Sequence, residues 1–453
     1  MSGAATARQA VDSPACAHRA SSGIPLKLAA AGLMIACQAV VLTMSAAASA
    51  AGTQELSAQK PAPLELKQPA SARPWHRYKV DSQGSTWPQT EWRNFNNLAN
   101  LNVSAPPHGA PGFHLPIQGD AERGRALAYD RSRGGSCVVC HIMGKTTPAQ
   151  PGNVGPDLST IGATRDDQFL FNYVYDPRIY NANSIMPPWG AYQVYRLDEV
   201  RDIVAFLKTL KEPYAIADKN ENPNTRAAPV ESRDNLDPTE NPAIFGLDLG
   251  REVFKRNGAN GKSCASCHAA PETAFKTWAA RMPRYEPRLR HVLGIEEFIT
   301  RHARATTGDN LLMQSNENTG LSIYLHNLAN GAPISPDLSS GGAQAALKNG
   351  QELMKRKIGQ LNMACVDCHT RERHANKWVR GQYLVESKGT TAHFPTWRTS
   401  RGDIWDIRKR FQWCNVSVRA DELPPDAREY GDIELALAAL NRGEKIKSPG
   451  IRH

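Results

Sequence analysis

The chain has 453 residues, a formal net charge of +10 and 41% hydrophobic residues. This length is enough for about two to four compact domains. The positive charge does not by itself indicate nucleic-acid binding, because no basic run with interleaved aromatic residues accompanies it. Docking of an acidic partner, or attraction of a small anion, explains the charge equally well. We therefore expect no nucleic-acid partner.

The N-terminal 50 residues are typical of an export signal. A polar stretch with three basic residues precedes an apolar run from about 28 to 44, and an Ala-x-Ala cleavage pattern follows at 48–50. The alternative is a retained membrane anchor, although a run of about 17 residues is at the short limit for a spanning helix. We predict cleavage near Ala50, a periplasmic location and no membrane span in the mature protein.

Six of the nine cysteines form three Cys-x-x-Cys-His motifs. In this motif the two thiols attach a c-type haem, and the adjacent histidine becomes the proximal iron ligand. A single Cys-x-x-Cys could instead be redox-active or bind zinc, but three copies that each end in His favour haem. The predicted haem-binding residues are Cys137, Cys140 and His141; Cys264, Cys267 and His268; and Cys365, Cys368 and His369.

A pair of helices is predicted around each haem motif. The leading helices begin at Gly124, Gly250 and Gly350, and amphipathic closing helices cover 197–210, 320–329 and 433–440. Two helices that cross around a haem form a cytochrome c domain, so we expect a mainly α protein with three such domains in tandem. The predicted boundaries are a signal peptide at 1–50, a loop-rich extension at 51–115, haem domains at 116–211, 244–335 and 336–453, and a linker at 212–243.

The sixth iron ligand decides what each haem does, and a Met or His there favours electron transfer. In the first domain we predict Met186, which follows His141 by 45 residues and lies in a loop fixed by two prolines. A core methionine is the alternative, although the loop lacks the apolar neighbours of a core segment. Met143 is too close to His141 to reach the other haem face. In the second domain the residues leave several ligands open, namely Met282, His291, His302, Met313 and His326.

In the third domain Cys414 follows His369 by 45 residues, the same spacing as in the first. A thiolate opposite a haem histidine is a strong donor and lowers the reduction potential. Met354, Met363 and His393 are alternative ligands. We predict that nearby cations lower the pKa of the Cys414 thiol and attract anions. These cations are Arg408, Lys409, Arg410 and Arg419. The alternative is a buried, inert cysteine beside a solvated charged face.

Further motifs surround the haem-binding residues. The first half contains GNVGPDL at 152–158 and IMPP at 185–188, and the second half contains GKSCASCH at 261–268, HFPTWR at 393–398, RFQWCN at 410–415 and SPGIR at 448–452. With these motifs the chain resembles a natural fusion of SoxX and SoxA, the two subunits of the SoxAX cytochrome of bacterial sulfur oxidation. The resemblance covers most of 118–452, and it implies that the last two haem domains pack as a SoxA-like pair.

The resemblance also implies an activity. SoxA belongs to an L-cysteine S-thiosulfotransferase that joins thiosulfate oxidatively to a carrier cysteine of SoxYZ and passes two electrons to an external cytochrome c. By this resemblance Cys414 ligates the active-site haem, with a possible persulfide modification, and Arg410 is the active-site arginine. The chemistry fits, because Arg410 can hold the thiosulfate dianion and Cys414 can form a covalent intermediate. The electrons are then expected to leave through the haem ligated by Met186.

One position departs from the family pattern. Dihaem SoxA proteins usually present a Cys as distal ligand of their first haem, but no Cys lies between 268 and 365 here. His302 aligns with that position, so we predict ligation by His268 and His302. Rival functions are a plain multihaem electron carrier, a tetrathionate-forming thiosulfate dehydrogenase and a dihaem peroxidase. A thiolate at Cys414 argues against the open iron of a peroxidase, and the match over 393–452 favours SoxA over the dehydrogenase.

Overall fold

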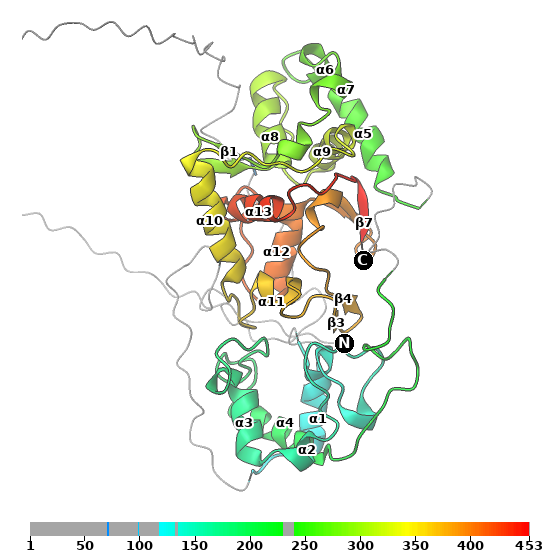
Figure 1. Cartoon of the computed structure of the whole chain (residues 1–453), viewed down its shortest axis with the longest axis vertical. Coiled ribbons are helices and arrows are strands. Elements are labelled where there is room, and N and C mark those ends of the chain that lie inside the picture. Colours follow the sequence, from blue (N-terminus) through cyan, green and yellow to red (C-terminus); the bar gives the residue numbers. More distant parts are fainter. Residues whose placement is uncertain (1–69, 72–97, 99–116, 132–134, 230–239, 453) are drawn as a thin grey trace, which may run out of the picture. The chain divides into compact units, whose positions relative to one another are not determined.

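The computed structural model describes residues 70–71, 98, 117–131, 135–229 and 240–452 (Figure 1). The predicted signal peptide lies outside the described residues, as does nearly all of the loop-rich extension. Helices dominate the described residues, which confirms the mainly α class. None of the helices in these ranges is long and apolar enough to cross a membrane. Residues 212–229, in the predicted linker, contain no helix or strand.

Three pairs of crossing helices organise the described chain (Figure 1). They are α1 (Ala121–Tyr129) with α4 (Leu197–Thr209), α5 (Ile244–Lys255) with α9 (Asn316–Leu328), and α10 (Gly341–Lys355) with α13 (Arg428–Leu440). In each pair, one helix precedes a Cys-x-x-Cys-His motif and the other follows it. The structure thus contains the leading and closing helices that the sequence predicts.

The three glycines that were expected to begin the leading helices lie inside them instead. A Cβ atom at each position would overlap a backbone carbonyl of the partner helix, with Gly124 against Asp202, Gly250 against Gly320, and Gly350 against Asp432. The helix backbones therefore approach so closely that only a residue without a side chain fits at the crossing. Each helix begins earlier; Ser340, for example, caps α10 by accepting a hydrogen bond from the backbone N–H of Ala343.

Further helices and short strands accompany these pairs. In the first part they are η3 (Cys137–Val139), η4 (Gly144–Thr146), α2 (Ile161–Thr164), α3 (Asp167–Tyr175) and η5 (Pro177–Ile179). In the second part they are α6 (Cys264–Cys267), α7 (Pro271–Ala274), η7 (Ala279–Arg281), β1 (Arg284–Glu286), β2 (His291–Leu293) and α8 (Ile295–Thr306). In the third part they are α11 (Cys365–His369), β3 (Trp378–Val379), β4 (Gln382–Tyr383), η8 (Thr391–His393), β5 (Thr396–Arg398), β6 (Asp403–Trp405), α12 (Ile407–Ser417) and β7 (Gly450–Arg452).

A three-stranded sheet brings together two sequence motifs that are far apart in the chain. β5 pairs antiparallel with β6 and parallel with β7, so that Arg398 lies opposite both Asp403 and Arg452. Arg452 donates a hydrogen bond of 2.9 Å to Nδ1 of His393. The sheet therefore joins the segments 393–398 and 448–452 beside α12.

Each helix pair encloses its own hydrophobic cluster. The three clusters centre on the fully buried side chains of Ile203, Ile323 and Leu353. Burying an aliphatic side chain of this size contributes about 1.5–3 kcal/mol, so these clusters are major stabilising elements. The first cysteine of each haem motif packs against the cluster of its own part. A haem attached there would extend the core.

The glycine crossings can be tested on a single helix. We expect Gly350→Ala to lower the midpoint of thermal unfolding, because the added methyl group forces α10 away from α13 at a cost of about 1–3 kcal/mol. Gly341 begins the same helix and has open space around it, so Gly341→Ala should leave the midpoint unchanged or raise it. Circular dichroism of the haem-loaded variants measures both. Equal midpoints for the two variants would contradict the close crossing.

Candidate active site

The histidines of the first and third motifs are oriented for metal binding through Nε2. Nδ1 of His141 lies 2.7 Å from the carbonyl oxygen of Pro156, and Nδ1 of His369 lies 2.8 Å from that of Val385. A carbonyl accepts the Nδ1 proton and so selects the tautomer with a free Nε2, which is the usual support for a metal-bound imidazole. Both histidines therefore fit the proximal position of a haem.

In the second motif His268 faces His302 across an apolar pocket. Their ring centroids are 6.2 Å apart, and two imidazoles that bind opposite sides of one metal ion at about 2 Å place their ring centres roughly 6 Å apart. The pocket has a volume of about 200 Å³ and is lined by aromatic and aliphatic side chains, including Phe275 and Trp278. Burial lowers the pKa of His302 to about 4, which keeps the neutral, metal-binding form at neutral pH.

The other candidate ligands of the second part make contacts outside this pocket. His291 bonds to Glu297 at 2.9 Å, and His326 bonds to the backbone oxygen of Ser322 at 2.9 Å. Met282 lines a different cavity from the one between His268 and His302. The structure thus brings together the predicted pair; its binding of iron stays a prediction.

Met186 lies in the loop that follows η5. It packs against the same hydrophobic cluster as Cys137, and its backbone N–H donates to the Ser184 hydroxyl at 3.1 Å. Met143, which the sequence excludes as a ligand, is fully buried in that cluster. The role of Met186 as distal ligand stays a prediction.

In the third part Cys414 on α12 lies within electrostatic reach of His369 at the end of α11, and His369 contributes to lowering the pKa of the Cys414 thiol. The alternative candidates for the distal ligand in this part make other contacts. Met354 is buried in the third cluster, Met363 packs against the first, and His393 accepts a hydrogen bond from Arg452. Of the candidate ligands in the third part, Cys414 is the one whose thiol is influenced by His369; its binding of iron stays a prediction.

Two arginines act on the Cys414 thiol. Burial raises the pKa of this thiol, but Arg410, His369 and Arg398 outweigh the effect and lower it to about 7. A substantial thiolate fraction at neutral pH makes the sulfur both a nucleophile and a metal ligand. Arg410 lies one helical turn before Cys414, so the two side chains share a face of α12.

Arg398 reaches the same site from β5. Burial lowers the pKa of Arg398 to about 9, and the neighbouring charge of Arg410 adds to the effect. The buried Nε of Arg398 has no hydrogen-bond partner. In the part of the chain that the structure describes, no Asp or Glu pairs with Arg398 or Arg410. Two cations without a counter-ion beside a sulfur nucleophile form a site suited to a small anion.

The predicted group of cations around Cys414 needs correction. Arg408 and Lys409 face elsewhere, because successive helical residues point about 100° apart. Arg408 lies on the opposite face of α12, and Lys409 pairs with Asp403 at 2.6 Å. Arg419 is buried beyond the end of α12. The sequence analysis missed Arg398 as a member of this site because it precedes Cys414 by 16 residues on another element, although it ends the motif at 393–398.

Arg408 is fully buried and joins three elements. It donates to Glu434 on α13 and to Glu297 on α8, both at 2.7 Å, and to the backbone oxygens of Val292 and Pro425. Burial raises the pKa of Glu297, but hydrogen bonding to His291 and the charge of Arg408 lower it to about 2. Removing one partner of such a buried ion pair lowers the free energy of unfolding by about 3–5 kcal/mol. This network therefore fixes the orientation of the helix that carries Arg410 and Cys414.

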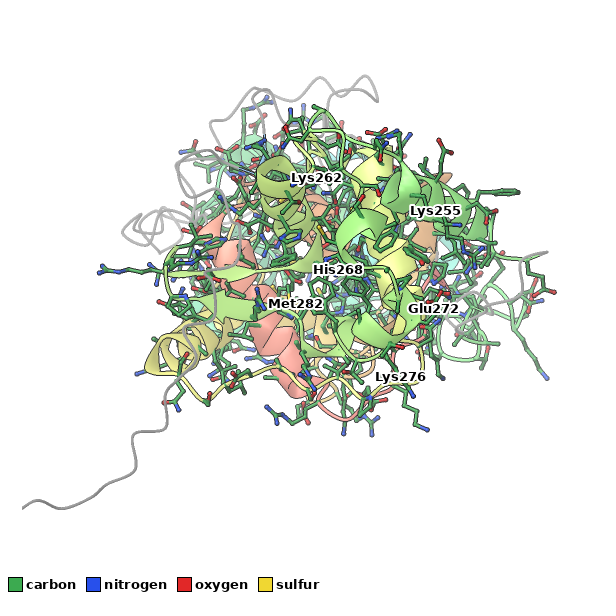
Figure 2. The ribbon with its side chains drawn as sticks, turned by 90° about the horizontal axis from the view of Figure 1, so that it is seen from above. Lys255, Lys262, His268, Glu272, Lys276 and Met282 are labelled. Atoms are coloured by element: carbon green, nitrogen blue, oxygen red, sulfur yellow. The ribbon has the colours of Figure 1, made fainter. Side chains whose placement is uncertain are left out.

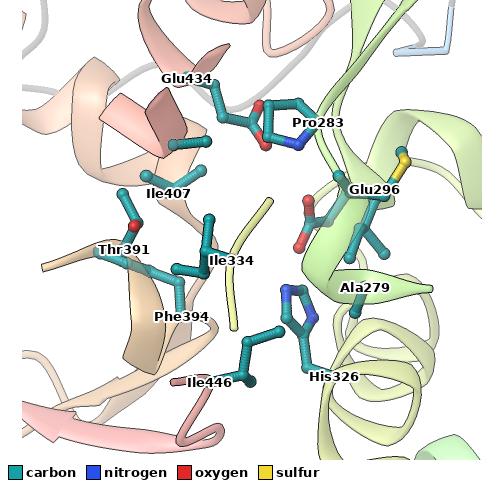
Figure 3. Close-up of a pocket in the computed structure, with 13 residues that line it drawn as sticks. Ala279, Pro283, Glu296, His326, Ile334, Thr391, Phe394, Ile407, Glu434 and Ile446 are labelled. Carbon is teal, nitrogen blue, oxygen red and sulfur yellow. The ribbon is translucent and has the colours of Figure 1, made fainter. Parts of the chain in front are cut away.

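A small internal cavity adjoins this network (Figure 3). Glu296 and His326 point into it, and its volume is about 50 Å³. The hydroxyl of Ser322 donates to Glu296 at 2.6 Å. Burial raises the pKa of Glu296 to about 8, and the charges of Asp406 and Glu434 add to the rise. Glu296 is therefore a neutral buried acid at pH 7.

Residues 249–334 match the family model described as SoxA/TsdA, cytochrome c domain. This stretch of the chain is therefore similar to a SoxA/TsdA-type cytochrome c domain. The matched range contains the motif Cys264 to His268 and also His302. A cytochrome c domain implies a covalently bound c-type haem, and the residues of the second motif fit one.

Curated relatives match a longer stretch of the chain than the family model does. SoxA of Pseudaminobacter salicylatoxidans is 28% identical over 218 residues, which cover 48% of this chain and 75% of the relative. SoxA of Chlorobaculum thiosulfatiphilum is 26% identical over 212 residues, which cover 47% of this chain and 72% of the relative. Both are named L-cysteine S-thiosulfotransferase subunit SoxA. The resemblance to SoxA is therefore confirmed, whereas the fusion with SoxX stays a prediction.

A solved structure, SoxXA from P. pantotrophus, is 25% identical with a TM-score of 0.44, and the match covers 48% of this chain and 80% of that chain.

The buried acid predicts a pH dependence of stability. Folding raises the pKa of Glu296 from 4.5 to about 8, so the folded chain holds a proton that the unfolded chain releases between these pH values. Stability therefore falls as pH rises from about 5 to 8, by up to about 1.4 kcal/mol per pH unit from this group. Glu296→Gln should flatten the fall in the thermal midpoint over this range.

Exposed Glu444 provides the control, since Glu444→Gln should leave the slope of the wild-type chain unchanged. Parallel slopes for Glu296→Gln and the wild-type chain would show that Glu296 is ionised in the folded state, against the prediction.

Proposed function

We propose that this chain joins thiosulfate oxidatively to the cysteine of a SoxYZ-type carrier protein and passes the electrons to an external cytochrome c, as an L-cysteine S-thiosulfotransferase. The observation that carries the proposal is the cluster at α12. There a cysteine thiol with a pKa near 7 lies close to a haem-motif histidine, and two arginines that pair with no Asp or Glu of the described residues adjoin it. The names of the curated SoxA relatives support the same activity.

The side chains of the site have different proposed roles. Arg398 and Arg410 bind and orient the thiosulfate dianion, and Cys414 supplies the sulfur through which the new bond is made. Joining thiosulfate to a carrier thiol forms one sulfur–sulfur bond and releases one proton and two electrons. Haem iron, when bound, accepts electrons one at a time. A persulfide on Cys414 would place the reacting sulfur one bond farther from the helix and nearer the carrier.

We further infer three c-type haems in domains 116–211, 244–335 and 336–453. Their proposed axial pairs are His141 with Met186, His268 with His302, and His369 with Cys414. The backbone N–H of Arg380 donates to the carbonyl oxygen of Val139 at 2.9 Å, so the third part contacts the first haem motif directly. This proximity supports passage of electrons between the SoxX-like and SoxA-like parts of one fused chain. We also propose that the N-terminal 50 residues direct export to the periplasm.

A thiosulfate dehydrogenase that forms tetrathionate is the second candidate. The matching family model is named for both SoxA and TsdA, so the domain alone does not separate the two activities. Both reactions use the same anion site, but the dehydrogenase joins two thiosulfates and needs no carrier. The product therefore distinguishes them, and a plain multihaem electron carrier would form neither product.

The mass of the SoxYZ-type carrier protein after the reaction tests the proposal. We expect incubation with thiosulfate, ferric cytochrome c and a SoxYZ-type carrier to add a thiosulfate group to the carrier cysteine, as measured by mass spectrometry. Cys414→Ala should abolish the adduct, whereas Ser417→Ala, an exposed position on the same helix, should not. Tetrathionate with an unmodified carrier would identify the dehydrogenase instead, and no reduction of cytochrome would indicate an electron carrier.

The second arginine has its own test. We expect Arg398→Gln to raise the KM for thiosulfate by about 10- to 100-fold, because one charged hydrogen bond to an anion contributes about 1.5–3 kcal/mol. Arg428→Gln, on the exposed side of α13, is the matched control and should leave KM unchanged. Steady-state reduction of cytochrome c measures both. An unchanged KM for Arg398→Gln would remove Arg398 from the binding site.

A further inference from the structure

The second haem motif lies nearer the surface than the other two. Among the six attachment cysteines Cys267 is exposed, whereas the other five are partly buried. The thioether bond joins the cysteine sulfur directly to a side group of the haem. Ser266, Ala269 and Ala270 beside Cys267 are exposed as well, so the segment that attaches this haem lies at the protein surface, where a second redox protein can approach it. The proposed reaction at Cys414 gives this surface no role.

Three exposed lysines surround this motif (Figure 2). Lys255 ends α5, Lys262 precedes Cys264 by two residues, and Lys276 follows α7. In Figure 2 they lie around His268 on one face of the molecule. Over the residues that the structure covers, none of the three forms an ion pair. Their charges are therefore available to a partner.

The surrounding segment is strongly positive. Residues 248–290 contain nine Lys and Arg against four Asp and Glu, a net charge of +5 out of the +10 of the whole chain. Two of the four acids already pair with neighbouring arginines, Asp248 with Arg251 at 3.1 Å and Glu286 with Arg288 at 3.0 Å. Glu272 is the acidic residue that Figure 2 labels among the lysines. The field around this haem motif is thus positive and attracts an acidic surface.

We propose that the face formed by Lys255, Lys262 and Lys276 docks an acidic electron-transfer protein at the second haem. The partner is a soluble protein whose one-electron centre, a haem or copper ion, lies beneath a patch of Asp and Glu. One electron crosses per encounter, so one centre is oxidised and the other reduced, and no bond or proton is exchanged. The proposal rests on the proposed oxidative function only for its supply of electrons; docking itself requires the lysines alone.

Charge complementarity favours a protein over a lipid surface or a nucleic acid. Lysines around a cofactor edge bring that edge close to a second redox centre, and a lipid headgroup or a phosphate backbone has none. Complementary charges at the rim of an interface act mainly on the association rate, which electrostatic steering raises by about 10- to 1,000-fold. The association rate and its dependence on salt are therefore the quantities to measure.

The test uses the haem-loaded full chain and an acidic, soluble monohaem cytochrome c as probe. Zero-length carbodiimide cross-linking joins lysine amines to carboxylates, and mass spectrometry should locate the cross-links at Lys255, Lys262 or Lys276. Surface plasmon resonance should show that reversing all three charges, each Lys→Glu, lowers the association rate at least about tenfold at low salt. A basic cytochrome c should not bind the wild-type chain.

Two matched variants separate the possible outcomes. Lys145→Glu reverses an exposed lysine near the first haem motif and should leave association unchanged. Cys414→Ala, which should abolish carrier modification, should also leave it unchanged, so failure of docking and failure of the proposed function can be told apart. Cross-links at Lys145, an unaltered rate for the triple variant, or equally strong binding of the wild-type chain to anionic vesicles would each overturn the proposal.

Discussion

The buried guanidinium of Arg408 fixes the helix on which the candidate site depends. α12 has a polar buried face, where Arg408, Gln412 and Asn415 bond to groups on neighbouring elements. Such a face is costly to desolvate, and every group in it needs its partner in the correct place. The helix is therefore held in one rotation about its axis. That rotation turns Arg410 and Cys414 toward His369.

The close helix crossings produce the same pairing of helices beside each of the three haem motifs. Because a glycine removes the side chain at each crossing, the two helices touch backbone to backbone. The first cysteine of each haem motif packs against the hydrophobic cluster beside such a pair. In the second part, Phe254 of one helix and Leu321 and Leu325 of the other line the pocket between His268 and His302. The three parts differ in the residues proposed as distal ligands and in the exposure of the attachment cysteines.

Much of this organisation is readable from the sequence because covalent haem attachment requires a fixed local motif. The three Cys-x-x-Cys-His motifs, the spacing of Cys414 after His369, and the helix pairs follow from local patterns. His302 was chosen as the candidate ligand only with the aid of a family resemblance, since the residues alone left several candidates open. The structure brings His302 into the pocket of His268 and leaves the rival residues outside it.

Other features depend on tertiary contacts that no local pattern encodes. Arg398 joins the site because β5 pairs with β7, the last strand of the chain. Arg408 lies close to Cys414 in the sequence, yet its charge is neutralised by Glu297 and Glu434, which precede and follow it by 111 and 26 residues. The glycines resembled helix starts because the same residue suits a helix end and a close crossing.

We propose that Cys414 and His369 would hold one haem iron between them beside an arginine-lined anion site. The decisive measurement is a crystal structure of the haem-loaded chain with an anomalous difference map at the iron absorption edge. We expect an iron peak between Nε2 of His369 and the sulfur of Cys414, with Arg398 and Arg410 facing the same sulfur. An iron whose sixth ligand is Met354, Met363 or His393, with Cys414 turned away, would contradict it.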